Sequence, residues 1–255
     1  MTDVRGTTVD IPTPDGTADA YLVHPDDSAA YPGVLLFQDA FGIRPALRAV
    51  ADRIASSGYT VLVPNIFHRF GLAPVFDLPE FIGPDNRAEV FERIVTALRG
   101  TNTDDLVRDA GAYLAWMRDA PQVAEGPVGL TGYCMGVRLV LRTAAAYPDR
   151  VAAAAGFHGS NLVGDTDASV EGVVGDITAQ VYLAFADEDP GMTPEQIHTL
   201  DKALAAGGVR ARSEVYSGAA HGFTQIDTAE YDAEAAERHH RELVALFGHT
   251  LRGQD

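Results

Sequence analysis

Cysteine is almost absent from this sequence, since Cys134 is the only one among 255 residues. A single cysteine cannot form an internal disulfide, which excludes a disulfide-stapled extracellular domain. The first residues, "MTDVRGTTVDIPTPDG", also lack the basic and then apolar pattern of a secretory signal. We therefore expect a cytoplasmic protein.

Positive charge and long apolar runs are scarce as well. The 19 Lys and Arg against 36 Asp and Glu give a formal net charge of −17, which repels nucleic-acid backbones and anionic membrane surfaces. No apolar run approaches the roughly 20 residues that cross a bilayer. Neither a nucleic acid nor a membrane is expected as a partner, and the oligomeric state is left open.

Short apolar runs alternate with helical patterns along most of the chain, the order expected when helices cross over a mostly parallel sheet. Runs such as "GVLLF" and "VYLAF" are almost continuously apolar, which is typical of strands covered by helices on both faces. The turn "PDG" at residues 14–16 predicts that the first two strands form an antiparallel hairpin. The predicted strands are residues 7–11, 18–23, 33–37, 60–64, 127–131, 151–157, 179–185 and 212–216.

Helical periodicity predicts helices within residues 45–58, 101–121 and 193–208, and a C-terminal helix from near Tyr231. Thr193 and Gln196 form a capping-box pattern with Pro194 at the first helical position. No repeat or linker divides the chain, so residues 1–255 are expected to form a single domain. Residues 65–100, rich in Pro, Gly and aromatics, are expected to be irregular and to form a lid or insertion over a site.

The only cysteine stands in "PVGLTGYCMGVR", an apolar strand followed by Gly-Tyr-Cys-Met-Gly and a helix. This is the G-x-S-x-G nucleophile elbow with Cys in place of Ser. Gly132 and Gly136 leave room for the tight turn, and the N–H of Met135 is free to donate at the start of the helix. Free cysteines are mostly buried apolar residues, but the strand and helix around Cys134 favour a nucleophile.

A nucleophile needs a base, and the base needs an orienting acid. His221, in "SGAAHGF", follows a predicted strand at the edge where sites of open α/β sheets lie, and is the candidate base. The stretch "ADEDP" follows another strand and offers Asp187, Glu188 and Asp189 as the acid, among which spacing alone does not choose. No motif typical of a metal site is present. The histidines placed less well are His24, His68, His158, His198, His239, His240 and His249.

Residues 33–69, the elbow "GYCMGVR" and the segment "AAHGF" together resemble the dienelactone hydrolase family. The resemblance implies an α/β-hydrolase fold and hydrolysis of an ester or lactone through an acyl-cysteine intermediate, without a cofactor. It assigns the acid to Asp189, with Asp187 as the second candidate. It also assigns the second oxyanion donor, beside Met135, to the backbone N–H of Ala40 or Phe41.

Two positions depart from the family pattern. Asp39 stands where a Glu usually lies near the resting nucleophile, and Gln225 stands where the best-known members carry an Arg that binds the substrate carboxylate. If Gln225 lines the pocket, neutral esters are expected to be better substrates than carboxylated lactones. Arg69 and Arg87, in the irregular segment, are candidates for a replacement cation.

Two other interpretations of the same residues stay open. A thioesterase or a peptidase would use the same triad. A non-catalytic binding or redox-sensing protein would need Cys134 but neither His221 nor Asp189, so the presence of all three favours catalysis.

Overall fold

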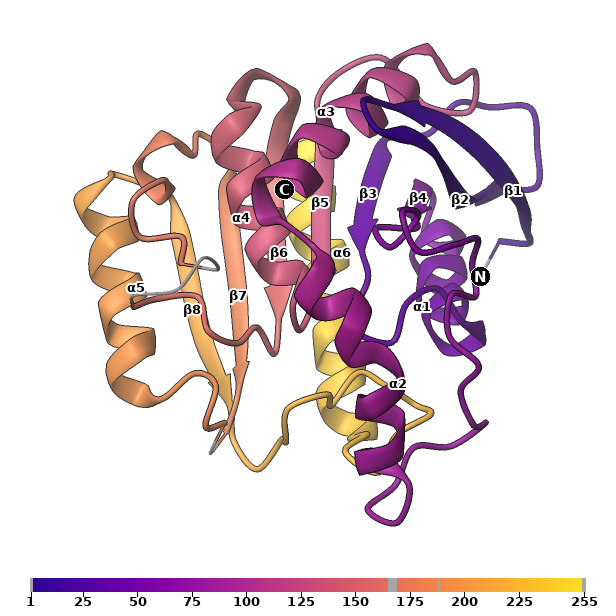
Figure 1. Cartoon of the computed structure of the whole chain (residues 1–255). Coiled ribbons are helices and arrows are strands. Elements are labelled where there is room, and N and C mark those ends of the chain that lie inside the picture. Colours follow the sequence, from indigo (N-terminus) through magenta and orange to yellow (C-terminus); the bar gives the residue numbers. More distant parts are fainter. Residues whose placement is uncertain (1, 165–168, 188, 254–255) are drawn as a thin grey trace.

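The computed structural model describes residues 2–164, 169–187 and 189–253. One eight-stranded sheet runs through the molecule in the order β1-β2-β4-β3-β5-β6-β7-β8 (Figure 1). The β1–β2 and β2–β4 pairs are antiparallel, and all other pairs are parallel. The strands are β1 (Val4–Thr13), β2 (Gly16–Pro25), β3 (Gly33–Phe37), β4 (Thr60–Pro64), β5 (Val128–Tyr133), β6 (Val151–Phe157), β7 (Gln180–Ala186) and β8 (Ala211–Tyr216).

All eight predicted strands and the predicted α/β-hydrolase fold are therefore confirmed. The hairpin turns at Pro14 and Asp15, where Thr13 pairs with Gly16, and Gly16 has a φ of 130° that favours glycine. The parallel strands β3 and β4 are buried at every residue. Their continuous apolar runs are explained by helices on both faces of the sheet.

Helices cover the two faces of the sheet, with α4 in front and α6 behind in Figure 1. The buried side chains of α1 and α6 pack into one core layer, and those of α3, α4 and α5 into the other. The helices are α1 (Pro45–Ser56), α2 (Arg87–Gly100), α3 (Thr103–Asp119), α4 (Gly136–Ala146), α5 (Pro194–Ala206) and α6 (Ala233–Arg252). The capping box of Thr193 and Gln196 is formed as expected at the start of α5.

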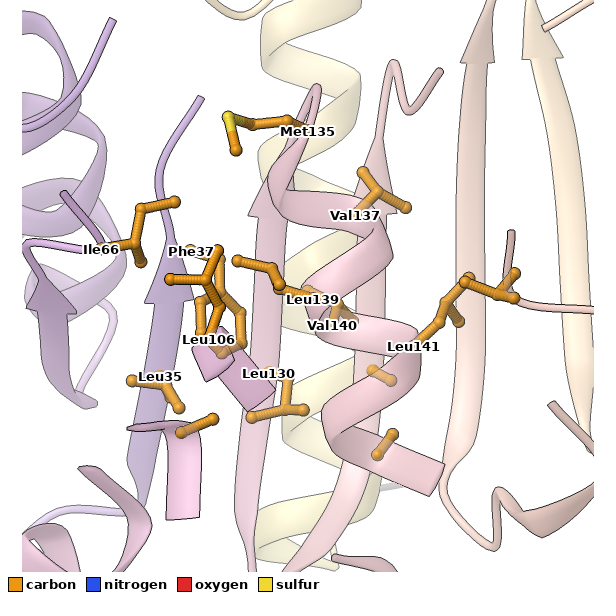
Figure 2. Packing of buried hydrophobic residues seen from close by; sticks show 14 of the residues in the cluster. Leu35, Phe37, Ile66, Leu106, Leu130, Met135, Val137, Leu139, Val140 and Leu141 are labelled. Carbon is orange, nitrogen blue, oxygen red and sulfur yellow. The ribbon is translucent and has the colours of Figure 1, made fainter. Parts of the chain in front are cut away.

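The packing of α4 fixes the elbow that precedes it. Figure 2 shows side chains of this helix, Leu139 and Val140 among them, lying over Phe37 of β3 and Leu130 of β5. All four side chains are completely buried, and burying a side chain of this size stabilises the fold by about 1.5–3 kcal/mol. The start of α4 is therefore held at the carboxyl ends of the central strands.

The prediction that residues 65–100 are irregular is wrong for their second half, which forms α2. Val90, Ile94 and Ala97 recur at helical spacing and are buried in the same core layer as α3 and α4. Apolar residues at this spacing were present in the sequence, but the Pro- and Gly-rich stretch before them obscured the period. In Figure 1, α2 runs along the front of the molecule, and Arg87 at its start lines the cavity that contains His221. A lid role for residues 65–100 stays a prediction.

Candidate active site

Cys134 lies at the turn between β5 and α4 in a strained backbone conformation. Its φ is 53°, in the left-handed region that residues other than glycine rarely occupy. A Cβ at Gly132 would lie 2.7 Å from the carbonyl oxygen of Gly136, and a Cβ at Gly136 would lie 2.7 Å from the carbonyl oxygens of Phe37 and Gln38. Both glycines are therefore required where the turn packs against β3 and α4, and the half-buried thiol of Cys134 is held at the sheet edge.

The carboxyl ends of β5, β7 and β8 bring Cys134, Asp189 and His221 together. The Nε2 atom of His221 lies 3.1 Å from the Sγ atom of Cys134, and its Nδ1 atom lies 2.6 Å from Oδ2 of Asp189. Asp187, the second candidate acid, instead accepts a hydrogen bond from the N–H of Gly218 at 2.9 Å. Glu188 lies outside the described residues. The geometry thus places Asp189, and not Asp187, against the imidazole.

The three groups favour a charged imidazole. Burial disfavours the protonated form of His221, but its hydrogen bonds with Asp189 and Cys134 and their negative charge outweigh burial and raise its pKa to about 10. For Asp189 the balance is similar, because burial opposes ionisation while the bonds from His221, Gly191 and Ser160 hold the pKa of the carboxyl below its usual range. The contacts of His221 therefore favour its protonated form.

Ser160 is a residue of this site that the sequence analysis missed. Its Oγ atom lies 3.2 Å from Oδ2 of Asp189 and 3.1 Å from Nδ1 of His221. A Cβ at Gly191 would lie 2.6 Å from this oxygen, so the loop after β7 needs glycine there. Ser160 follows β6 in "GFHGS", and the rule that polar residues past strand ends gather at the site would have found it.

Two backbone N–H groups, those of Met135 and Ala40, are candidates for the donors that bind an oxyanion. Among the described residues, no hydrogen bond engages the N–H of Met135 or of Ala40. The N–H of Phe41, the alternative to Ala40, donates to Oδ1 of Asp39 at 2.9 Å. Of the two candidates for the second oxyanion donor, Ala40 is thus the one with a free donor.

Asp39 belongs to a buried network and not to the immediate surroundings of the thiol. Its carboxylate accepts two bonds from Nη1 of Arg44, at 2.8 and 3.0 Å, and one from Nε2 of Gln225 at 2.8 Å. Arg44 also donates to Asp227 from Nε at 2.5 Å and from Nη2 at 3.1 Å. No bond between Asp39 and Cys134 occurs in the part of the chain that the structure describes. The expected contact of Asp39 with the resting nucleophile is therefore corrected to a contact with Arg44 and Gln225.

The cavity beside the triad has a volume of about 780 Å³. Its described lining contains Arg87 and His221 but neither Gln225 nor Arg69. Gln225 is buried with its amide on Asp39, which corrects the expectation that it lines this cavity. Arg69 pairs instead with Asp109 and Asp15. Cys134 is not among the described lining residues, but it contacts the imidazole of His221, which does line the cavity.

Two other histidines near the site are buried and uncharged. His158 contacts the His221 ring edge to face at 5.2 Å and bonds Thr224 through Nε2 at 2.7 Å. Burial, and then the positive charge of His221, hold the pKa of His158 well below its usual value. His239 lies 2.9 Å from the hydroxyl of Tyr133, and its pKa is lowered by burial to about 3. Both pack beneath the site.

Neither a metal centre nor a membrane span is evident within the described ranges. No group of three or more His, Cys, Asp or Glu there could hold a metal ion. No helix in the described part of the chain combines the length and the apolar character that crossing a bilayer requires.

Comparisons with known proteins agree with the geometry. The model of the dienelactone hydrolase family matches residues 18–251. The "Putative carboxymethylenebutenolidase" of Synechocystis sp. is 28% identical over 256 residues, which cover 98% of this chain and 99% of that protein. Among solved structures, the "Putative Dienelactone Hydrolase" from Klebsiella pneumoniae superimposes with a TM-score of 0.83 at 22% identity, covering 97% of this chain and 99% of the other. The dienelactone hydrolase from Anabaena variabilis gives a TM-score of 0.70 at 17% identity, with 97% and 98% covered.

Proposed function

Because the chain belongs to the dienelactone hydrolase family and is therefore a hydrolase, we propose that it cleaves carboxylic esters or lactones through an acyl-cysteine intermediate on Cys134. One observation carries the proposal. The thiol, the imidazole of His221 and the carboxylate of Asp189 are joined by contacts of 3.1 and 2.6 Å at a strained elbow. A binding protein would have no need of this chain of three groups.

In the acylation step the sulfur of Cys134 attacks the carbonyl carbon after its proton has passed to Nε2 of His221. The oxyanion of the tetrahedral intermediate accepts hydrogen bonds from the N–H groups of Met135 and Ala40. The C–O bond then breaks, His221 protonates the leaving alkoxide, and an acyl thioester remains on Cys134. From a lactone, the alcohol stays attached as part of the acyl group.

In the deacylation step the imidazole of His221 removes a proton from water, and the hydroxide attacks the thioester carbonyl. The C–S bond breaks, the carboxylic acid leaves, and the proton returns to the pair formed by His221 and Cys134. Asp189 stays ionised throughout, holding the imidazole in the orientation that aims Nε2 at the sulfur. Each step uses only this chain's side chains, two backbone N–H groups and water.

A panel of small esters, thioesters, lactones and a peptide, assayed with wild type and with Cys134→Ala, tests the proposal. We expect ester and lactone turnover that falls at least about a thousandfold in Cys134→Ala while the variant keeps the wild-type circular dichroism and melting curve. Mass spectrometry of acid-quenched wild type should show the mass of the acyl group on the peptide that contains Cys134.

Other results would replace the proposal with one of the alternatives. Faster turnover of thioesters or of the peptide would favour a thioesterase or a peptidase. A chain without any turnover but with reversible oxidation of Cys134 would favour the redox-sensing protein. Undiminished activity of a clean Cys134→Ala preparation would remove the nucleophile assignment altogether.

A further inference from the structure

The cavity beside His221 carries an uneven distribution of charge. Its described lining contains three carboxylates, one guanidinium and one imidazole. Even with the imidazole protonated, the carboxylates outnumber the cations by one. The charged lining residues are Asp187, Asp189, Glu230, Arg87 and His221.

Both cations of the lining already have an anionic partner. Nδ1 of His221 is bonded to Asp189, and Nη1 of Arg87 is bonded to Oε1 of Glu230 at 2.5 Å. The second oxygen of Glu230, Oε2, is buried and has no hydrogen-bond partner. An anionic substrate that approaches Arg87 therefore competes with the carboxylate of Glu230, which is already bound there. If the substrate displaced Glu230, this carboxylate would be left without a cation.

Glu230 packs against the loop that carries His221, and both residues line the cavity. Its Cβ atom lies 3.6 Å from the place that a Cβ would take on Gly222, the residue that follows His221. Asp187, on the same cavity, accepts a bond from the N–H of Gly218 and forms no ion pair within the described part of the chain. Two carboxylate groups thus face the cavity without a cation that is free to offset an incoming negative charge.

We propose that Glu230 and Asp187 are specificity-determining residues, which make the site prefer uncharged or cationic esters to esters with an anionic group near the reacting carbonyl. The inference rests on the proposed function, because it concerns the ester that Cys134 attacks. Like charges brought close together repel each other, and in water this repulsion weakens as the salt concentration rises. An anionic ester meets this repulsion, whereas a cationic ester finds a partner in Asp187, which lines the cavity.

Three butanoate esters of similar size and different charge test the inference. They are the choline ester, its uncharged analogue the 3,3-dimethylbutyl ester, and the anionic 3-carboxypropyl ester. We expect kcat/KM of wild type to fall in this order, with about tenfold or more between the uncharged and the anionic ester. Because the cause is electrostatic, raising the NaCl concentration should shrink this ratio.

Variants of the ion pair give predictions of opposite sign. Glu230→Gln releases Arg87 and should raise the ratio of anionic to uncharged turnover by about tenfold. Arg87→Gln leaves the carboxylate of Glu230 alone and should lower the same ratio. Glu125→Gln removes an equal charge from an exposed position just before β5. This position lies at the amino end of the strand, away from the triad, so kcat/KM for all three esters should stay unchanged.

The outcomes separate the two proposals. Equal or faster turnover of the anionic ester by wild type, or a ratio that neither salt nor Glu230→Gln changes, would overturn the charge preference alone. The wild-type series and its salt dependence decide this even if a variant does not fold. If none of the three esters is turned over in a manner that depends on Cys134, the proposed function fails and the inference fails with it.

Discussion

The side-chain amide of Gln225 donates to the carboxylate of Asp39, with 2.8 Å between Nε2 and Oδ2. These are the two positions at which the sequence departs from the family pattern, and they are in contact with each other. Arg44 supplies the positive charge beside Asp39, and the amide of Gln225 completes this buried network. Gln225 is therefore not among the described residues that line the cavity, which include Arg87 and Glu230.

The contact of Asp189 with His221 predicts unequal effects of two matched substitutions. Asp189→Asn should lower kcat roughly a thousandfold or more, because an amide there favours the wrong imidazole tautomer. Asp187→Asn removes the same charge two residues away, where the carboxylate meets only the N–H of Gly218, and should cost less than about tenfold. Steady-state kinetics with one uncharged ester measures both, and a reversed order of severity would contradict the placement of Asp189.

The hydroxyl of Ser160 is expected to position the imidazole through its contacts with Asp189 and His221. Ser160→Ala should lower kcat by about tenfold, on the scale of a hydrogen bond to a charged group, and should shift the pH profile of kcat/KM. Ser213→Ala is the matched control, since the buried Oγ of Ser213 has no partner in the described structure. Equal kinetics of Ser160→Ala and wild type across the pH range would show that the hydroxyl has no positioning role.

Arg44 holds two carboxylates, and its loss should destabilise the fold. Arg44→Met leaves Asp39 buried with only neutral donors, which typically costs about 3–5 kcal/mol. Arg48→Met makes the same chemical change four residues later, where the guanidinium lies over the ring of Tyr21, and should cost less than about 1 kcal/mol. Urea unfolding measures the difference, and equal free energies of unfolding for the two variants would contradict a structural role of the network.

Stability should fall on both sides of neutral pH. His158, His239 and His240 have pKa values below that of an unfolded histidine, near 6.5, so the unfolded state takes up protons first as the pH falls below 6.5. The free energy of unfolding should therefore drop by about 3 kcal/mol between pH 6 and pH 5. His221 acts in the opposite direction, because its pKa of about 10 gives stability that is lost as the pH rises from about 6.5 to 10.

Chemical denaturation at a series of pH values measures both slopes. His239→Gln should reduce the slope below pH 6.5 by about a third, since one of the three histidines with a lowered pKa is gone while His158 and His240 stay. His198→Gln changes an exposed histidine on α5 and serves as the control. A free energy of unfolding that stays flat from pH 6.5 to pH 5 would contradict the buried, uncharged state of His158 and His239.

The sequence by itself determined the strands, most of the helices and the elbow around Cys134. Each of these depends on residues close together in the chain: a continuous apolar run for β3, a capping box at Thr193, and Gly132 and Gly136 on either side of Tyr133, Cys134 and Met135. Helix α2 was missed although its signal was local, because its apolar period follows a stretch rich in Pro and Gly. The backbone preference of a segment and the spacing of its apolar residues depend only on the residues of that segment, so the sequence alone predicts them.

The tertiary structure alone decided which side chains meet at the edge of the sheet. From the residues alone, Asp187 and Asp189 were equivalent, and the fold separates them because the loops after β7 and β8 put only Asp189 beside His221. Asp227 bonds Arg44 from 183 positions away in the chain, and Glu230 bonds Arg87 from 143 positions away. No local pattern encodes such pairs, because a side-chain contact depends on where distant loops come together once the core has packed.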